Sequence, residues 1–205
     1  MGKKNNKVIG IIDYGLGNVN AFQEIVKKLN IDYKLISNEK ELVDLKKIIL
    51  PGVGSFDWAI SKLKRANLYE PINKLVMSGM PILGICVGMQ IMAESSEEGS
   101  MNGFGWINCR VKKLKNFQVP HMGWNTLEFE KETLLFDEIK EKSEFYFLHS
   151  FAFDSSTESM TSSSNYQEII CSSIQKNNIY GVQFHPEKSH ENGIQVIKNF
   201  CEKIT

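Results

Sequence analysis

The chain has 205 residues, and its 24 Lys and Arg residues balance 24 Asp and Glu residues, so the formal net charge is zero. A neutral chain has no general field that attracts nucleic acid or anionic lipid, and its apolar runs are far shorter than a membrane span. The stretch "MGKKNNKVIGIIDYG" is basic, but its apolar run is too brief for a secretory signal. The four cysteines are scattered without a C-x-x-C pair, which argues against a zinc site or a disulfide framework. We therefore expect a cytoplasmic protein with reduced thiols, no metal, and no nucleic-acid or membrane partner.

In chain order, the first half alternates strand-like and helix-like segments. Apolar runs predict strands at 7–13, 32–37, 46–52 and 81–85, and helical spacing predicts helices at 18–30, 56–66 and 68–78. Such alternation is typical of a parallel sheet with helices on both faces, in which ligands bind at the carboxyl ends of the strands.

The second half changes to short strands and turns. Strands are predicted at 109–114, 125–130, 144–153, 167–174 and 179–184, and a last helix at about 192–203. The Ser-rich stretch "SSTESMTSSSN" at 155–165 predicts an exposed hairpin loop, because strands resume directly after it. The whole chain, 1–205, is therefore expected to form one domain.

The stretch "PILGICVGMQIM" at 81–92 places Cys86 between two glycines. G-I-C-V-G has the form of the nucleophile elbow G-x-S-x-G, with sulfur in place of oxygen. Gly84 and Gly88 would permit a tight strand-to-helix turn, the helix N-terminus would stabilise a thiolate, and the N–H of Val87 would face a developing oxyanion. Five residues alone fit a buried structural cysteine equally well. A nucleophile also requires a base.

The base is expected in "GVQFHPEKS" at 181–189. In an extended strand His185 and Glu187 would share one face, and Pro186 restricts the preceding residue to extended geometry. A carboxylate beside an imidazole raises its basicity and fixes its tautomer. The alternatives for this motif are a strand-end histidine with a surface glutamate, or a zinc site with His190, for which no fourth ligand is suggested.

Two glycine-containing loops follow other predicted strands. In "LPGVGSFDWA" at 50–59, Gly52 or Val53 could supply a second oxyanion N–H, and a structural turn is the alternative. In "DYGLGNVN" the dinucleotide fingerprint G-x-G-x-x-G would need glycine where Asn20 stands, so we interpret this stretch as a strand–helix turn.

Taken together, "PGVGSF", "LGICVGMQ" and "GVQFHPEKS" resemble the class I, triad-type glutamine amidotransferases. The segments "IIDYGLGN", "SSEEG", "VPHMGWN" and "YFLHSF" narrow the resemblance to the glutaminase subunits of imidazole glycerol phosphate synthase. The resemblance implies an α/β fold of three layers in a single domain, with a flavodoxin-like, mixed but mainly parallel sheet and helices on both faces. It also implies hydrolysis of L-glutamine without a cofactor, with the ammonia passed to a separate cyclase or synthase subunit in a heterodimer of histidine biosynthesis.

The resemblance also implies a role for individual residues. Cys86 matches the nucleophile, His185 the general base and acid, and Glu187 its orienting partner. The remaining matches are the oxyanion or substrate positions Gly52, Val53, Val87, Gln90, His149 and Ser150, and the cyclase-facing positions His121, Trp124 and Lys188.

Some segments depart from the family pattern. "GFGWINC" carries Asn108 and Cys109 where a Pro-Gly pair is common, Phe151 stands where tyrosine is common, and 155–165 is unusually Ser-rich. None of these touches the predicted triad. They leave open a paralogue that supplies ammonia to another acceptor, such as a surface-glycan sugar. A free-standing cysteine hydrolase of the same fold should lack "VPHMGWN" and "HPEKS", and a non-catalytic interaction module should have lost part of the triad.

Overall fold

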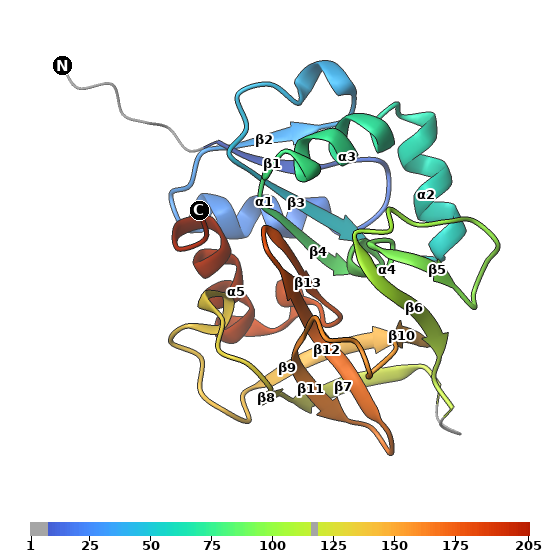
Figure 1. Ribbon diagram of the computed structural model, residues 1–205. Coiled ribbons are helices and arrows are strands. Elements are labelled where there is room, and N and C mark those ends of the chain that lie inside the picture. The colour runs from blue at the N-terminus through green and yellow to red at the C-terminus, as the bar shows by residue number, and fades with distance from the viewer. Residues whose placement is uncertain (1–7, 116–118) are drawn as a thin grey trace.

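The computed structural model describes residues 8–115 and 119–205 and is built on an eight-stranded sheet (Figure 1). The strands β2, β1, β3, β4 and β13 are parallel, and β12, β11 and β8 continue the sheet antiparallel. In spatial order the bounds are β2 (Tyr33–Ile36), β1 (Ile9–Ile12), β3 (Lys47–Gly52), β4 (Ile82–Cys86), β13 (Ile179–Val182), β12 (Ile169–Lys176), β11 (Met160–Asn165) and β8 (Glu128–Phe129).

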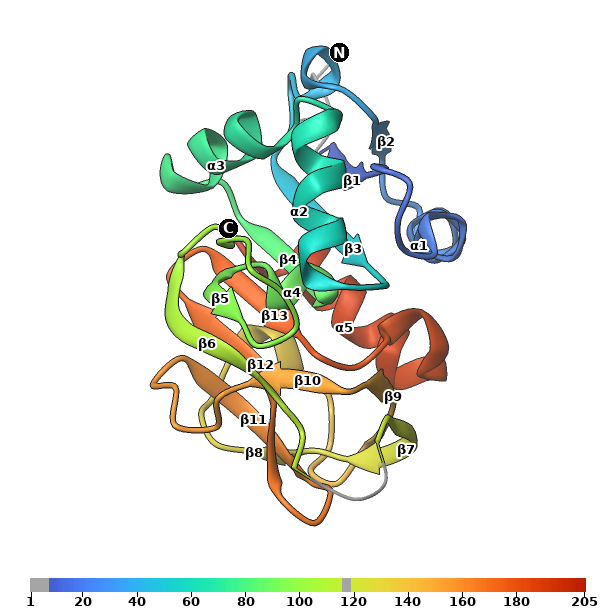
Figure 2. The same cartoon turned by 90° about the vertical axis from the view of Figure 1, so that its right-hand side faces the viewer.

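Helices cover both faces of the parallel strands (Figure 2). The helices α1 (Val19–Lys28) and α5 (His190–Glu202) pack together on one face, and α2 (Phe56–Arg65) and α3 (Tyr69–Met77) lie together on the other. Each buries one stripe of apolar residues; in α1 this stripe includes Val19, Phe22 and Val26. No helix in the described parts of the chain combines the length and apolar character needed to cross a membrane.

The parallel half of the sheet contains the strands that the sequence predicts. Every residue of β3, β4 and β13 is buried, as expected for strands covered on both faces. The spatial order from β2 to β13 is the flavodoxin-like order, and the three-layer α/β fold is confirmed. In this arrangement Gly52, the last residue of β3, lies opposite Cys86, the last residue of β4.

The antiparallel half was predicted less well. The strand expected at 144–153 is two strands, β9 (Glu144–His149) and β10 (Phe151–Phe153), which belong to different sheets. β9 pairs with β7 (His121–Thr126), and β10 pairs with β6 (Ile107–Lys113), which in turn pairs with β5 (Ala93–Ser96). The first strand, predicted from position 7, begins at Ile9; residues 1–7, including the start of the stretch in which no secretory signal is predicted, lie outside the described residues.

The Ser-rich segment is the clearest error of the sequence analysis. Residues 160–165 form the inner strand β11, and Thr161 to Ser164 are at most 3% exposed. Their hydroxyl groups bond within the sheet: Ser173 on β12 contacts both Thr161 Oγ1 at 2.7 Å and Ser162 Oγ at 2.6 Å. Serine clusters usually mark loops because hydroxyls compete with backbone hydrogen bonds. Here the hydroxyls satisfy one another across two strands, so the segment can be buried.

Replacing Ser173 with alanine would leave the two hydroxyls of Thr161 and Ser162 without this buried partner. We expect Ser173→Ala to lower the free energy of unfolding by about 1–3 kcal/mol. Ser155→Ala, in the same Ser-rich stretch but exposed, is the matched control and should change it by less than about 0.5 kcal/mol. Urea unfolding of both variants measures the difference, and equal stability of the two would contradict the buried hydroxyl pairing.

Candidate active site

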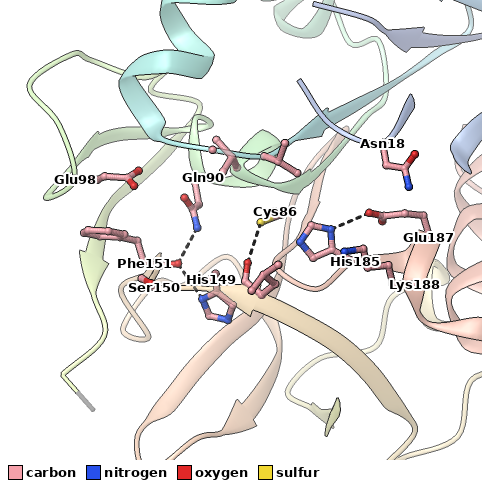
Figure 3. A pocket seen from close by; sticks show the side chains of 14 residues that line it. Asn18, Cys86, Gln90, Glu98, His149, Ser150, Phe151, His185, Glu187 and Lys188 are labelled. Carbon is pink, nitrogen blue, oxygen red and sulfur yellow. Dashed lines mark hydrogen bonds and ion pairs between the residues drawn. The ribbon is translucent and has the colours of Figure 1, made fainter. Parts of the chain in front are cut away.

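A cavity of about 360 Å³ lies at the carboxyl ends of β3 and β4, beside the segment that follows β13 (Figure 3). This is the carboxyl edge at which the sequence predicts a ligand site. Most of the predicted site residues line it: Val53, Cys86, Val87, Gln90, His149, Ser150, His185, Glu187 and Lys188. The structure adds residues to which the sequence analysis gave no role in the site: Asn18, Gly54, Glu98, Leu148 and Phe151.

Cys86 stands on a strained turn at the end of β4. Its backbone has φ 54° and ψ −112°, a conformation that costs a non-glycine residue about 1–3 kcal/mol. The turn requires glycine beside it, because a Cβ on Gly88 would lie 1.9 Å from the carbonyl oxygen of Leu50. This geometry is that of a nucleophile elbow, which presents the side chain at the edge of the sheet.

The helix after the elbow is shorter than the sequence indicates. α4 (Val87–Gln90) is a single turn, after which the chain turns into β5. A single turn carries little of the macrodipole that a long helix presents at its N-terminus. Stabilisation of a thiolate therefore depends on the groups in direct contact with the sulfur.

His185 and Glu187 form an ion pair inside the cavity wall. Nδ1 of His185 lies 2.9 Å from Oε1 of Glu187, and Figure 3 shows the imidazole between this carboxylate and Cys86. Glu187 is not in an extended strand as predicted: it lies in the 3-10 helix Pro186–Lys188. The turn reaches the same geometry because Ser189 Oγ donates to the His185 carbonyl at 2.7 Å and accepts from the Tyr146 N–H at 3.0 Å.

The environment of His185 favours its charged form. Burial by itself lowers the pKa of this imidazole, but hydrogen bonds and charge interactions with Cys86 and Glu187 raise it to about 10. The cation is stabilised there because the carboxylate of Glu187 lies on one side of the ring and the sulfur of Cys86 on the other. The second carboxylate oxygen of Glu187, Oε2, is buried without a hydrogen-bond partner, so the charge of Glu187 is directed to His185.

The loop after β3 is held beside the elbow. Tyr14 donates a hydrogen bond from its hydroxyl to the Pro51 carbonyl at 2.9 Å. Burial, followed by the charge of Cys86, raises the pKa of Tyr14, so the hydroxyl stays a donor. Gly52 itself does not line the cavity but packs on the elbow, where a Cβ would lie 2.4 Å from the Gly88 nitrogen; Val53 does line it. No pattern in the sequence predicts this role of Tyr14.

Gln90 and His149 are held by bonds within the protein. Nε2 of Gln90 donates to the Phe151 carbonyl at 2.7 Å. The same carbonyl accepts a bond from Nδ1 of His149 at 3.0 Å, and Nε2 of His149 lies 3.1 Å from Nδ1 of His121. Both ring nitrogens of His149 are thus occupied, so His149 supports the wall of the cavity and has no nitrogen left for a substrate. Ser150 lines the cavity between β9 and β10.

The prediction that His121 faces a partner is wrong. The side chain is 2% exposed and stacks on Phe147 and Tyr166, with ring centroids at 4.6 and 4.0 Å. Alternation along β7 turns His121 inward and turns Met122 and Trp124 outward. Trp124 is 46% exposed and stacks on His190 at 5.0 Å.

Lys188, also predicted to face a partner, is exposed at the edge of the cavity. Its Nζ lies 5.3 Å from the centre of the Tyr146 ring. Tyr146 pairs with Trp124 across β7 and β9, so Lys188 and Trp124 belong to one surface.

Glu98 is a second carboxylate of the cavity that the sequence analysis passed over. Its Oε2 accepts the N–H of Phe56 at 2.7 Å and caps α2. In Figure 3 Glu98 lies beyond Gln90, on the opposite side of Cys86 from Glu187. Glu98 belongs to the segment "SSEEG", which resembles the family but predicts no role for this residue. Within the described residues no group of three or more His, Cys, Asp or Glu side chains could hold a metal ion, so the zinc alternative with His190 finds no ligand set.

Comparison with known proteins identifies the family of the chain. The family model "Glutamine amidotransferase class-I" matches residues 10–204. A chain of PurLQS from Thermotoga maritima aligns with a TM-score of 0.77 at 17% identity, covering 98% of this chain and 100% of that one. A structure described as a glutamine amidotransferase aligns with a TM-score of 0.75 at 18% identity, covering 95% and 97%. These two show the fold, and the family match places the chain among the class-I glutamine amidotransferases.

Curated relatives narrow the assignment. "Imidazole glycerol phosphate synthase subunit HisH" of Leptospira borgpetersenii is 43% identical over 202 residues, covering 95% of this chain and 99% of the relative. The protein of the same name from Bdellovibrio bacteriovorus is 42% identical, covering 95% and 100%. "Imidazole glycerol phosphate synthase subunit HisH 2" of Methanococcus maripaludis is 42% identical, covering 96% and 100%. Within its class the chain belongs to this HisH family.

The buried histidine pair should make the fold sensitive to mild acid. Burial lowers the pKa of His121 to about 4, and burial together with the charge of His121 lowers that of His149 to about 3. Both are neutral in the folded state, whereas their unfolded values are near 6.5. Their stabilising contribution is therefore complete above pH 6.5 and decreases as the pH falls, by up to about 1.4 kcal/mol per pH unit for each histidine.

We expect His149→Gln to remove about half of the loss of stability seen in urea unfolding between pH 6.5 and about 5. His190→Gln, at an exposed histidine, is the matched control and should keep the full loss. The neutral buried pair would be contradicted if His149→Gln and wild type lost stability in parallel.

Proposed function

We propose that this chain is the glutaminase subunit of an imidazole glycerol phosphate synthase: it hydrolyses L-glutamine and passes the ammonia to a separate cyclase subunit. The observation that carries the proposal is the strained Cys86 elbow facing the His185–Glu187 pair. Relatives over the full length of the chain are named as synthase subunits, which supports a heterodimer that works in the cytoplasm.

The reaction follows from the positions of three side chains. The Cys86 thiolate attacks the side-chain amide carbon of glutamine, and backbone N–H groups near Val53 and Val87 receive the oxyanion. The His185 cation donates its proton to the departing nitrogen, which leaves as ammonia. The same imidazole, held by Glu187, then takes a proton from water, whose oxygen attacks the thioester and releases glutamate. The thiolate is regenerated.

The cavity also supplies groups for the other end of the substrate. The carboxylate of Glu98 is suited to the α-ammonium group of glutamine, because a buried cation needs an opposite charge. Gln90 lies between Glu98 and Cys86 in Figure 3. Its amide nitrogen is occupied by Phe151 and Gln183, so its oxygen is the atom available to a substrate.

The surface beside the cavity is suited to a protein partner. Met122, Trp124 and Leu148 are 63%, 46% and 36% exposed and lie on the paired strands β7 and β9. Exposed apolar groups gathered in this way are typical of interaction sites. Leu148 also lines the cavity. A cyclase bound here would receive ammonia before it is protonated in bulk water, which a free-standing cysteine hydrolase has no need to arrange.

The alternative of a paralogue that aminates a surface-glycan sugar gains no support. The curated relatives reported above share one name, which refers to imidazole glycerol phosphate synthase. The departures at Asn108 and Cys109 lie at β6, and neither residue lines the cavity.

The first test is the release of glutamate from glutamine by the chain together with its cyclase. Cys86→Ala should abolish it, because no other group can form the thioester. Cys201→Ala is the matched control: this cysteine is also buried, at 4% exposure, but lies in α5 away from the cavity. Turnover of Cys86→Ala at more than about one-hundredth of the wild-type rate would rule out this nucleophile, since the covalent route through a thioester is lost altogether without the sulfur.

A second test concerns activation by the partner. The "PGVG" loop can turn a peptide N–H toward or away from the oxyanion site, and a partner that binds the competent form shifts that equilibrium. One oxyanion donor is worth about 10²–10³ in rate, so the cyclase should raise glutaminase activity by at least that order.

Trp124→Ala should weaken this activation while leaving alkylation of Cys86 unchanged. Met77→Ala is the control, because Met77 is 69% exposed at the end of α3, next to the amino end of β4. Full activity of the isolated chain would refute the activation but not the glutaminase.

A further inference from the structure

Gln183 is a buried polar residue for which the proposed mechanism has no use. It follows β13, two residues before His185, and is 0% exposed. Its Nε2 lies 3.6 Å from Sγ of Cys86, within hydrogen-bonding reach for sulfur. A buried amide next to a nucleophile can stabilise one protonation state of the thiol over the other.

The orientation of the Gln183 amide is fixed by its neighbours. The carbonyl of Phe151 can only accept, so the Gln90 atom at 2.7 Å from it must be the amino group. The same amino group lies 3.0 Å from Gln183, which must therefore present its oxygen there. The amino group of Gln183 is then the end that faces Cys86. The amide cannot flip without losing the bond to Gln90.

The sulfur thus has different partners in its two protonation states. As a thiol, Cys86 can donate its S–H to the carbonyl oxygen of Leu148, 3.9 Å away. As a thiolate it has no proton to donate and needs donors, which are the imidazole of His185 and the amide of Gln183. Hydrogen bonds to a charged group are about twice as strong as neutral ones.

We propose that Gln183 is a catalytic residue that donates a hydrogen bond to the Cys86 thiolate from the buried side of the elbow, while Gln90 holds its amide in the donating orientation. The inference rests on the proposed glutaminase function and assigns to a buried strand-end amide part of the stabilisation that a long helix would otherwise supply. Because the donor approaches from inside the sheet, it leaves the cavity face of the sulfur open to the substrate.

The test is the pH dependence of Cys86 alkylation by iodoacetamide, followed by mass spectrometry of the Cys86 peptide. Gln183→Met keeps the length of the side chain and removes the donor. The pH of half-maximal alkylation should rise by about one unit or more, since a hydrogen bond to a charged group is worth that much. In the complex with the cyclase, kcat for glutamate release should fall about tenfold at neutral pH with KM changed much less.

Gln175→Met is the matched control, because Gln175 lies in β12 and bonds Tyr180 at 3.3 Å, away from Cys86. It should keep the wild-type alkylation profile and kcat. Gln183→Leu is the second variant if Gln183→Met does not reach the wild-type thermal midpoint. An unchanged profile in a folded Gln183 variant, or the same shift in Gln175→Met, would overturn the inference. Absence of glutamate release by wild type would refute the glutaminase instead, and the alkylation profile would still report on Gln183.

Discussion

The structure depends on one close approach, that of the turn after β4 to the backbone of β3. Gly88 leaves no room for a side chain against the Leu50 carbonyl, and Cys86 takes a positive φ of 54° to enter the turn. The strain is supported by completely buried parallel strands on both sides. Any residue larger than glycine at position 88 would push the turn away from the sheet and move the sulfur from its partners.

The positions of the other site residues follow from the order of the strands beside this turn. β3 and β13 flank β4, so the segments that follow them end beside Cys86. One brings Val53 to the cavity. The other brings His185 and Glu187 to the cavity and Gln183 to the buried side of Cys86. The smaller sheet of β7 and β9 closes the other side, and its outer face carries Trp124. The proposed nucleophile, the proposed base and the proposed docking surface therefore lie on elements that contact one another, as activation by a partner would require.

The parallel strands, their helices, Cys86, His185 and Glu187 could be predicted from the sequence, because apolar runs and glycine-bearing turns report directly on burial and tight backbone geometry. Gln90, His149, Ser150 and Lys188 could be predicted only from the family resemblance, and five other residues that line the cavity could not be predicted. β11 is predicted as a loop, because serines whose hydroxyls bond to one another across two strands have the same sequence pattern as serines in loops. His121 is predicted on the wrong side of its strand, because the face of β7 that is buried depends on the pairing of β7 with β9. Gln183 gave no signal, since its role arises from the orientation that Gln90 and Phe151 impose.

The elbow and its hydrogen-bond donors should make Cys86 the reactive one of four buried thiols. Burial raises the pKa of Cys171, Cys201 and Cys109, and these thiols have no imidazole beside them. The most direct measurement is alkylation of the folded chain at neutral pH with a small neutral reagent, with the modified fraction of each cysteine followed over time. We expect rapid labelling of Cys86, slowed by glutamine, and labelling of the other three cysteines only after unfolding. Comparable rates at all four cysteines, or a Cys86 that stays unlabelled, would contradict it.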